Sequence, residues 1–237
     1  MGNINPSAIG ESSNAWALVD SRYPRRWYDA WGMVDKEIVN TYRAADWTVT
    51  ATGTAPVAAS LLPDAKILIS TQASTDFSGD NMQVLGSRFK LEAGKPVYFG
   101  AKLTMSEATQ STLLFGLCGV DTTLTAASSA HAIAVSAGGA FFSKLDGVTA
   151  GLFKTYTTGT EVNSAAAFTA DTSAHWYEMY WDGYKLYGYY DGTIVATFGS
   201  GITTEVLTPS ICFRKGDTAA GVYTLTVHEF ITIAVRG

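Results

Sequence analysis

The sequence predicts an all-β protein built from two antiparallel sheets that pack face to face. Three observations support this prediction: Thr, Val, Ile and aromatic residues are abundant from Trp47 onward, Gly, Asp, Asn and Ser mark regular turns, and no long amphipathic helix is present. The chain has 237 residues, of which 47% are apolar and 16% are charged. A disordered chain would be less hydrophobic and more charged, so the composition indicates a folded protein with a substantial core.

Two segments near the middle of the chain carry the clearest strand patterns. Residues 97–105 alternate between apolar side chains and polar or small ones. This period of two predicts an antiparallel strand with one buried face. Residues 112–120 are apolar on both phases, which predicts a strand in the centre of a sheet.

Residues 176–198 are predicted to form a three-stranded meander. Asp182-Gly183 separates residues 177–181 from 185–190, and Asp191-Gly192 separates the second segment from 193–198. The Asp-Gly pair suits the positive φ angles of a type I′ turn, whose twist matches that of the flanking strands. Both pairs therefore predict tight hairpin turns.

The last predicted strand covers residues 222–235, and its apolar pattern changes phase near His228. Glu229 falls on the apolar phase and Phe230 on the polar one. A β-bulge near His228 would resolve both conflicts, because the extra residue shifts the alternation by one position.

The remaining segments define the predicted domain organisation. Residues 1–26 show little periodicity and are expected to form an extended N-terminal arm, followed by a single β-sandwich domain over residues 27–237. Segments 125–139 and 159–174 are rich in Ala, Ser and Gly, and we expect them to be loops at one end of the sandwich.

The charge pattern excludes several classes of partner. The net charge is −5, whereas nucleic-acid binding requires clustered Lys and Arg, so no nucleic-acid partner is expected. Arg22, Arg25 and Arg26 are a local exception, interpreted either as a solvated basic turn or as an arm that docks on an acidic surface. No run reaches the ~18 apolar residues of a membrane helix, and residues 1–10 do not resemble a secretion signal. No membrane partner is expected.

No metal or other cofactor is expected. Cys118 and Cys212 each lie in an apolar run and are interpreted as buried free thiols, although facing strands could bring them together. Residues 76–81 carry two aspartates around a glycine, but they lack the spacing of a calcium loop. A strand-connecting turn explains the same composition.

The sequence shows no pattern typical of a catalytic centre. None of its three histidines lies in the context of a nucleophilic triad: His131, His175 and His228. Glycoside hydrolysis needs two carboxylates about 5–9 Å apart, which on one strand would produce a Glu-x-Asp-x-Glu string. No such string is present, and the acids of the later strands and turns are isolated in sequence: Glu178, Asp182, Asp191 and Glu229. We therefore expect no enzymatic activity, although acids from different strands could still converge.

The predicted meander is aromatic on both phases, so one face must fill the core and the other must be covered or exposed. Tyr184, Tyr187 and Tyr189 are the candidates for an interface or for a platform on which sugars stack, because Tyr and Trp are enriched at binding surfaces. Both interpretations remain open at this stage.

Residues 95–124 resemble the central signature of a family of tailed-bacteriophage head proteins. The matching features are a Lys-Pro-Val-Tyr-Phe strand, a Thr-Gln-Ser turn and an apolar strand that ends in Asp-Thr-Thr-Leu. The hairpins after Trp176, the Leu-Thr-Pro-Ser string at 207–210 and the Leu-Thr-Val string at 225–227 extend the resemblance over residues 47–236. The chain departs from the family where His228-Glu229 replaces a usual Asp-aromatic pair.

The resemblance implies a concanavalin-like (lectin-like) jelly-roll sandwich that decorates and stabilises a phage capsid. It further implies a homotrimer that bridges capsomers, the major capsid protein as partner, and a location on the virion exterior after assembly in the bacterial cytoplasm. No catalytic residues follow from it. Capsid or subunit contacts are expected at seven residues: Trp16, Arg22, Tyr23, Arg25, Arg26, Trp27 and Tyr28. The alternative is a carbohydrate-binding module that attaches to host or other glycans.

Overall fold

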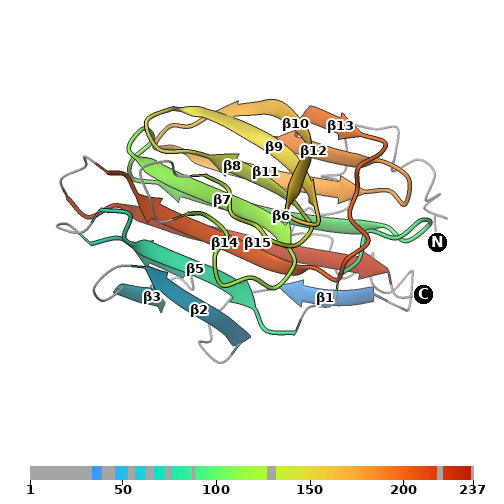
Figure 1. The fold of residues 1–237 in the computed structure, drawn as a ribbon, viewed down its shortest axis with the longest axis horizontal. Helices are drawn as coiled ribbons and strands as arrows, with labels where there is room; N and C mark the ends of the chain where they lie inside the picture. The colour runs from blue at the N-terminus through green and yellow to red at the C-terminus, as the bar shows by residue number, and fades with distance from the viewer. Residues whose placement is uncertain are drawn as a thin grey trace, which may run out of the picture.

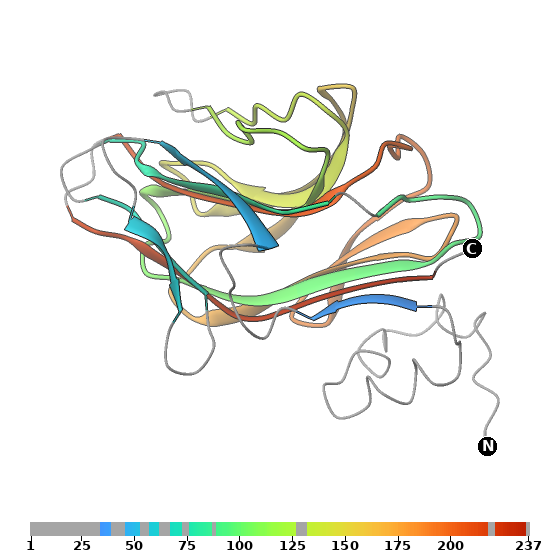
Figure 2. The ribbon, with the colours of Figure 1, turned by 90° about the horizontal axis from the view of Figure 1, so that it is seen from below.

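The structure is a computed structural model, and it describes residues 34–38, 46–52, 57–61, 67–72, 76–86, 89–126, 132–217 and 221–235. These residues form fifteen strands in two antiparallel sheets, as the sequence predicts (Figure 1). Figure 2 shows the sheets as two layers, which we call sheet A and sheet B. Within the described part of the chain, no helix has the length and apolar character needed to cross a membrane.

Sheet A contains, from one edge to the other, β13 (Thr193–Phe198), β12 (Leu186–Tyr190), β11 (Ala174–Trp181), β6 (Val97–Met105), β15 (Thr224–Val235), β4 (Ile67–Ser70) and β3 (Val57–Leu61). The short strand β1 (Val34–Ile38) pairs with the C-terminal half of β15. Sheet B contains β10 (Thr160–Thr169), β9 (Ala150–Thr157), β8 (Gly139–Lys144), β7 (Ser111–Cys118), β14 (Thr208–Lys215), β5 (Gly79–Val84) and β2 (Trp47–Thr52).

The core lies between the sheets and is built from alternate residues of each strand. The ring of Phe99 from sheet A stacks on Phe115 from sheet B with centroids 4.7 Å apart. Tyr177 meets Phe142 edge-on at 5.6 Å. Because each of these rings is at most 1% exposed, their burial ties the two sheets together. The predicted strand at 97–105 is confirmed as β6, and every residue of the central strand β7 is buried.

The predicted bulge in the last strand is confirmed. Val227 pairs with Leu103 and Glu229 pairs with Lys102, so His228 is the extra residue in β15. After the bulge, the register places Phe230 opposite the buried Ala101. The phase conflict in the sequence therefore marks the position of the irregularity.

Of the two predicted loop segments, 159–174 is mostly strand, whereas the described residues of 125–138 are a connection, as predicted, that lies elsewhere than at one end of the sandwich. Residues 160–169 form β10, so the expected loop over 159–174 is wrong for most of its length. Among the described strands β10 pairs only with β9, and it is largely exposed. A strand at a sheet edge can use small polar residues that carry no apolar pattern. The other segment is part of a long connection, 119–138, whose described residues lie across the outer face of sheet B (Figure 2).

The predicted turn at Asp191-Gly192 is confirmed, because both residues have positive φ angles of 47° and 75°. The predicted N-terminal arm, residues 1–26, lies outside the described residues.

Candidate functional site

The candidate site lies on the outer face of sheet A, where the meander adjoins β6. Tyr177, Met179 and Trp181 of β11 belong to the core between the sheets. Because side chains alternate along a strand, Glu178 and Tyr180 lie on the opposite, outer face. Residues that pair with these two on the neighbouring strands share the outer face.

Four tyrosines form a row across this face, which we call the tyrosine row. The row consists of Tyr98 on β6, Tyr180 on β11, and Tyr187 and Tyr189 on β12. Tyr180 lies opposite Tyr98 on one side and opposite Tyr187 on the other. The rings of Tyr180 and Tyr187 stack with centroids 6.3 Å apart, and those of Tyr187 and Tyr189 are 6.5 Å apart. Neighbouring rings therefore hold one another in place.

The tyrosine row reaches solvent only near the turn between β11 and β12. Tyr98, Tyr180 and Tyr189 are buried, whereas Tyr187 is half-buried and Tyr184, in the turn itself, is 72% exposed. Of the three tyrosines predicted as binding or interface residues, the structure exposes Tyr184, partly exposes Tyr187 and buries Tyr189. The surface available for stacking a ligand is thus the turn and the ring beside it.

Glu178 lies within the tyrosine row and is only 1% exposed. The Tyr98 hydroxyl donates to its Oε1 at 2.7 Å, while Oε2 has no hydrogen-bond partner among the described residues. Burial raises the pKa of Glu178 to about 7, against the opposing effect of the Tyr98 hydrogen bond. Gly100, opposite Glu178, leaves room for this pair, because a Cβ there would lie 2.5 Å from the Tyr98 hydroxyl. The face therefore holds a buried carboxyl group whose pKa is raised toward neutral pH.

Asp182 shapes the turn that presents Tyr184. Its Oδ1 accepts hydrogen bonds from the backbone N–H groups of Tyr184 and Lys185, at 2.7 and 2.6 Å, and its Oδ2 accepts one from the Tyr187 hydroxyl at 3.2 Å. Only Gly183 of the Asp-Gly pair has a positive φ, of 99°. The predicted two-residue type I′ turn is therefore wrong here: the connection has four residues, and the Asp182 carboxylate caps its backbone.

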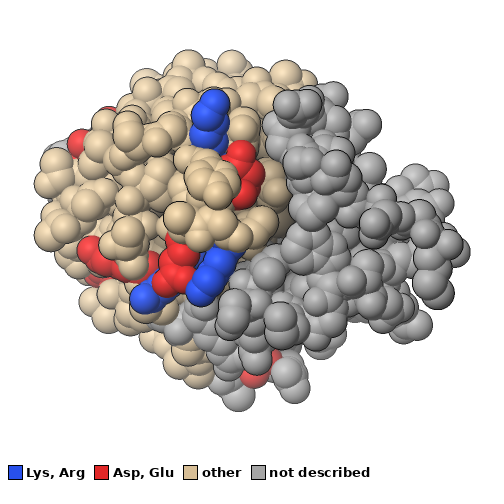
Figure 3. All heavy atoms as spheres, turned by 90° about the vertical axis from the view of Figure 1, so that its right-hand side faces the viewer, with Lys and Arg blue, Asp and Glu red and all other residues tan. Residues whose placement is uncertain are grey.

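The loop before β6 packs beside this turn. The Gly94 N–H donates to the Gly183 carbonyl at 3.1 Å, and the Trp181 indole N–H donates to the Glu92 carbonyl at 2.8 Å. The Glu92 carboxylate pairs with Lys95 at 2.7 Å, and the hydrogen bond from Lys95 lowers the pKa of Glu92. We call residues 90–95 and 182–187 together the Tyr184 end. In Figure 3, which faces the end of the molecule toward which β11 runs in Figure 1, basic and acidic groups stand out from a largely uncharged surface.

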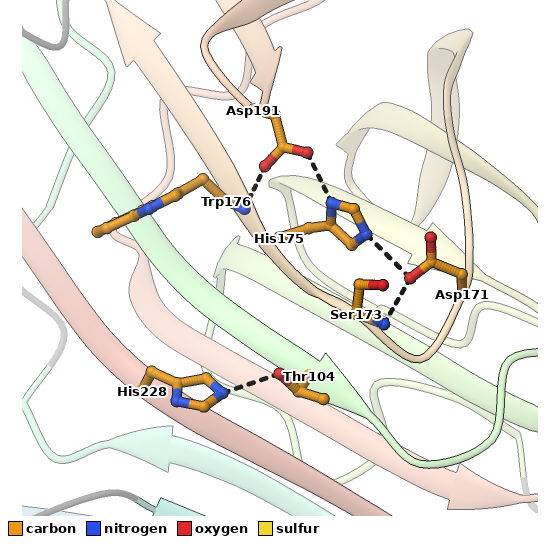
Figure 4. Close-up of polar contacts among 7 residues, drawn as sticks. All are labelled: Thr104, Asp171, Ser173, His175, Trp176, Asp191 and His228. Atoms are coloured by element: carbon orange, nitrogen blue, oxygen red, sulfur yellow. Dashed lines mark hydrogen bonds and ion pairs between the residues drawn. The ribbon is translucent and has the colours of Figure 1, made fainter.

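A second polar cluster lies where β11 begins (Figure 4). The His175 ring bonds to Asp191 Oδ2 through Nδ1 at 2.6 Å and to Asp171 Oδ1 through Nε2 at 2.9 Å. The backbone N–H groups of Trp176 and Ser173 hold these two carboxylates. Two carboxylate partners require a donor at each ring nitrogen, which only the imidazolium provides. Partial burial lowers the pKa of His175, the two hydrogen bonds raise it, and the net shift is upward.

The sequence left open that acids distant along the chain converge, and this cluster is such a case. Asp191 closes a turn, as predicted, and it also meets Asp171 on the imidazole of His175. His228 bonds to the Thr104 hydroxyl at 2.8 Å (Figure 4), and His131 lies outside the described residues. Sequence spacing gives no sign of the His175 cluster, since its residues come from a loop, a strand and a turn.

The remaining candidates do not form a site within the described part of the chain. Asp80 of the 76–81 segment is buried in β5, and Asp76 lies 3.9 Å from the Lys215 ammonium. Among the described residues there is no group of three or more His, Cys, Asp or Glu side chains that could hold a metal ion. Cys118 and Cys212 are buried free thiols, as expected, and burial raises the pKa of Cys118.

The residues expected to contact a capsid or a second subunit all lie outside the described residues: Trp16, Arg22, Tyr23, Arg25, Arg26, Trp27 and Tyr28. The structure describes only the backbone of Glu229.

No protein-family model and no curated protein sequence matches the chain. Solved structures share its fold. An endo-1,3-beta-glucanase from Streptomyces sioyaensis superposes with a TM-score of 0.60 at 13% identity, over 86% of this chain and 95% of the glucanase. A Bacillus licheniformis beta-glucanase gives 0.60 at 12% identity, over 85% and 98%. A Lotus tetragonolobus seed lectin gives 0.58 at 7% identity, over 86% and 100%.

These similarities show that the sandwich is a concanavalin-like jelly roll, the fold that the resemblance to phage head proteins implies. They also correct the expectation that the chain is not an enzyme. Several proteins with this fold are glycosidases, so hydrolysis is an activity that such a scaffold can support. At these identities the similarity extends to the fold alone, and the activity has to be argued from the site.

Proposed function

We propose that this chain binds carbohydrate at the Tyr184 end. The observation that carries the proposal is the Tyr184 ring, 72% exposed, beside the half-buried Tyr187 and the Asp182 carboxylate that joins them. Among the described residues Tyr184 is the one aromatic side chain that is largely exposed, and tyrosine is enriched at binding surfaces because its ring is apolar and its tip is polar. A sugar offers C–H groups to an aromatic face and hydroxyl groups to polar side chains, and this turn supplies the exposed Tyr184 ring and, next to it in sequence, the exposed Lys185.

The rigidity of the site supports the same proposal. The backbone of the turn is fixed by Asp182, and the Tyr187 ring is fixed between Tyr180 and Tyr189. A turn backbone and a Tyr187 ring that are already ordered lose little conformational entropy when a ligand binds beside them. The seed lectin among the fold neighbours is consistent with a jelly roll that serves as a binding scaffold.

The test is titration of the full chain with neutral and charged oligosaccharides, followed by calorimetry. Tyr184→Ala should weaken saccharide binding about tenfold or more, because the lost stacking is worth about 1 kcal/mol or more. Tyr184→Phe keeps the ring and should bind like the parent. Binding that is unchanged in Tyr184→Ala, or the absence of binding to every saccharide, would overturn the proposal.

The same saccharides should be assayed for release of reducing sugars, because the fold is shared with glucanases. Glu178 has the raised pKa, about 7, that a general acid needs near neutral pH, but it is 1% exposed, so a substrate reaches it only if the surrounding tyrosines move. Release of reducing sugar that disappears in Glu178→Gln, with saccharide binding retained, would add a hydrolytic role to the binding one.

A second candidate function is decoration of a phage capsid, as a trimer in contact with the major capsid protein on the virion exterior. It rests on the resemblance of residues 95–124 to phage head proteins. Many weak contacts repeated by symmetry would give such a protein high avidity for the shell. The two candidates are compatible, because a protein anchored to a particle can also present a glycan-binding surface.

The capsid proposal is tested by deleting residues 1–26 and measuring binding to empty phage heads, together with the mass of the full chain in solution. We expect a trimer, and we expect the deletion to abolish decoration. Undiminished decoration by the truncated chain would rule out the arm as the anchor, and a monomeric full chain would contradict the trimer.

A further inference from the structure

We infer that the carbohydrate bound at the Tyr184 end is anionic, a saccharide chain that carries carboxylate or sulfate groups. This inference rests on the proposed function and concerns the class of ligand that the site selects. It starts from the positions of the basic side chains, which are unevenly distributed over the described surface.

The structure describes the placement of eight Lys and Arg side chains. Four of them are buried: Lys144, Lys154, Arg214 and Lys215. The four that reach solvent are Lys90, Lys95, Lys102 and Lys185. Three of these four belong to the Tyr184 end, although the chain as a whole has a net charge of −5. The accessible positive charge of the described surface is therefore concentrated around the exposed tyrosine.

The acidic groups of the Tyr184 end leave this charge uncompensated. Glu92 is shared between two lysines, at 2.7 Å from Lys95 and 3.7 Å from Lys90. Both lysine side chains remain about half exposed, at 44% and 45%. Lys185 has no carboxylate within ion-pair distance among the described residues. Three lysines against the carboxylates of Glu92 and Asp182 give this end a net positive charge.

The hydrogen bonds of the turn place the positive charge beside the stacking surface. Lys185 follows Tyr184 directly, and the Gly94–Gly183 backbone hydrogen bond holds the loop with Lys95 against the same turn. Asp182 is already engaged by two backbone N–H groups and the Tyr187 hydroxyl. The lysines therefore belong to the two backbone segments that meet at the Tyr184 turn, where ammonium groups can pair with an anionic substituent of a bound saccharide.

The experiment compares oligosaccharides of equal length that differ in charge. Oligogalacturonides supply carboxylates, sulfated dextran oligosaccharides supply sulfates, and laminari-oligosaccharides are the neutral reference. At low ionic strength we expect at least one anionic series to bind about tenfold more tightly than the neutral one, with the difference reduced by added salt. The two anionic series distinguish which substituent the lysines prefer.

The variant that removes the charge is Lys90→Gln/Lys95→Gln/Lys185→Gln, with Lys102→Gln as the control for a lysine outside the Tyr184 end. Preference for the anionic series should disappear in the triple variant and persist in the control.

Equal binding of neutral and anionic series that is lost in Tyr184→Ala would overturn the inference and leave the proposed function standing. Binding of neither would overturn both. Equally tight binding of polyphosphate or a single-stranded oligonucleotide would also overturn the inference, since the site would then respond to charge without recognising a saccharide.

Discussion

The outer faces of the two sheets differ in chemistry: the face of sheet B is apolar, and the face of sheet A carries polar aromatic side chains. On sheet B the outer face carries Leu114, Phe141 and Cys212, which are buried beneath Leu124 and Val135 of the chain's own connection between β7 and β8. On sheet A the outer face carries tyrosines and a carboxyl group. Its row of rings ends in an exposed turn.

Hydrogen bonds fasten the cover of sheet B. The Gln83 side chain accepts a hydrogen bond from the Asp121 N–H at its Oε1, at 2.8 Å. It donates one from its Nε2 to the Gly119 carbonyl, at 3.0 Å. The Asp121 carboxylate in turn accepts the N–H and hydroxyl of Ser136, at 2.8 and 2.6 Å. An apolar face has to be removed from water, so this cover stabilises the fold. On sheet A most of the tyrosine row is buried too, and the part that a ligand can reach is the exposed Tyr184 turn with the half-buried Tyr187 ring beside it.

The largest expected effect is on the covered face of sheet B. Phe141→Ala should lower the free energy of unfolding by about 3–5 kcal/mol, because it removes a fully buried ring that packs on Tyr156 at 5.2 Å. Tyr187→Ala on the outer face of sheet A should cost only about 1 kcal/mol, because that ring is half-buried. Urea unfolding of both variants measures the difference, and equal losses would remove the distinction between a structural face and a binding face.

A second prediction concerns the buried carboxyl group of sheet A. The pKa of Glu178 is raised from 4.5 to about 7, so the folded state holds the proton more tightly than the unfolded state. Stability therefore falls as the pH rises from about 4.5 through 7. Glu178→Gln keeps an oxygen for the Tyr98 hydroxyl and removes this loss. It should be more stable than the parent at pH 8 by roughly 2–3 kcal/mol, and of similar stability at pH 4.

Urea unfolding of Glu178→Gln at the two pH values tests this prediction. An unchanged difference between parent and variant across the pH range would mean that Glu178 ionises as freely as an exposed carboxyl. A confirmed gain would show that the outer face of sheet A retains a group that destabilises the fold, as binding and catalytic sites often do.

The sequence was informative wherever side-chain periodicity reports burial. β6 and β7 are predicted by their apolar patterns, and the bulge at His228 follows from a conflict in phase between residues 227 and 230. β10 could not be predicted in this way, because the side chains of this exposed edge strand are small and polar and show no apolar face. Its composition is that of a loop.

The candidate site was less predictable because it is assembled by pairing between distant segments. Tyr98 and Glu178 are 80 residues apart in sequence and meet only because β6 pairs with β11. The aromatic richness of the meander indicated that tyrosines matter there. Which of them are exposed depends on the four-residue turn that Asp182 imposes, and an Asp-Gly pair alone predicts a different turn.

The smallest expected effect belongs to the His175 cluster, at the opposite end of the meander from Tyr184. Here Asp171, in the loop after β10 of sheet B, and Asp191, in the turn between β12 and β13 of sheet A, meet on one imidazole, so the cluster links the edges of the two sheets. His175→Phe keeps an aromatic ring against Tyr190, whose centroid lies 4.9 Å from that of His175, and removes both hydrogen bonds.

Since the folded pKa of His175 is raised above 6.5, the contribution of the cluster is complete below about pH 6.5 and is lost as the pH rises through the folded pKa. The parent should exceed the variant by about 1 kcal/mol at pH 6 and by much less at pH 9, as measured by urea unfolding. A difference that stays constant between these pH values would show that His175 contributes through packing, and that the link between the sheet edges is not made by charge.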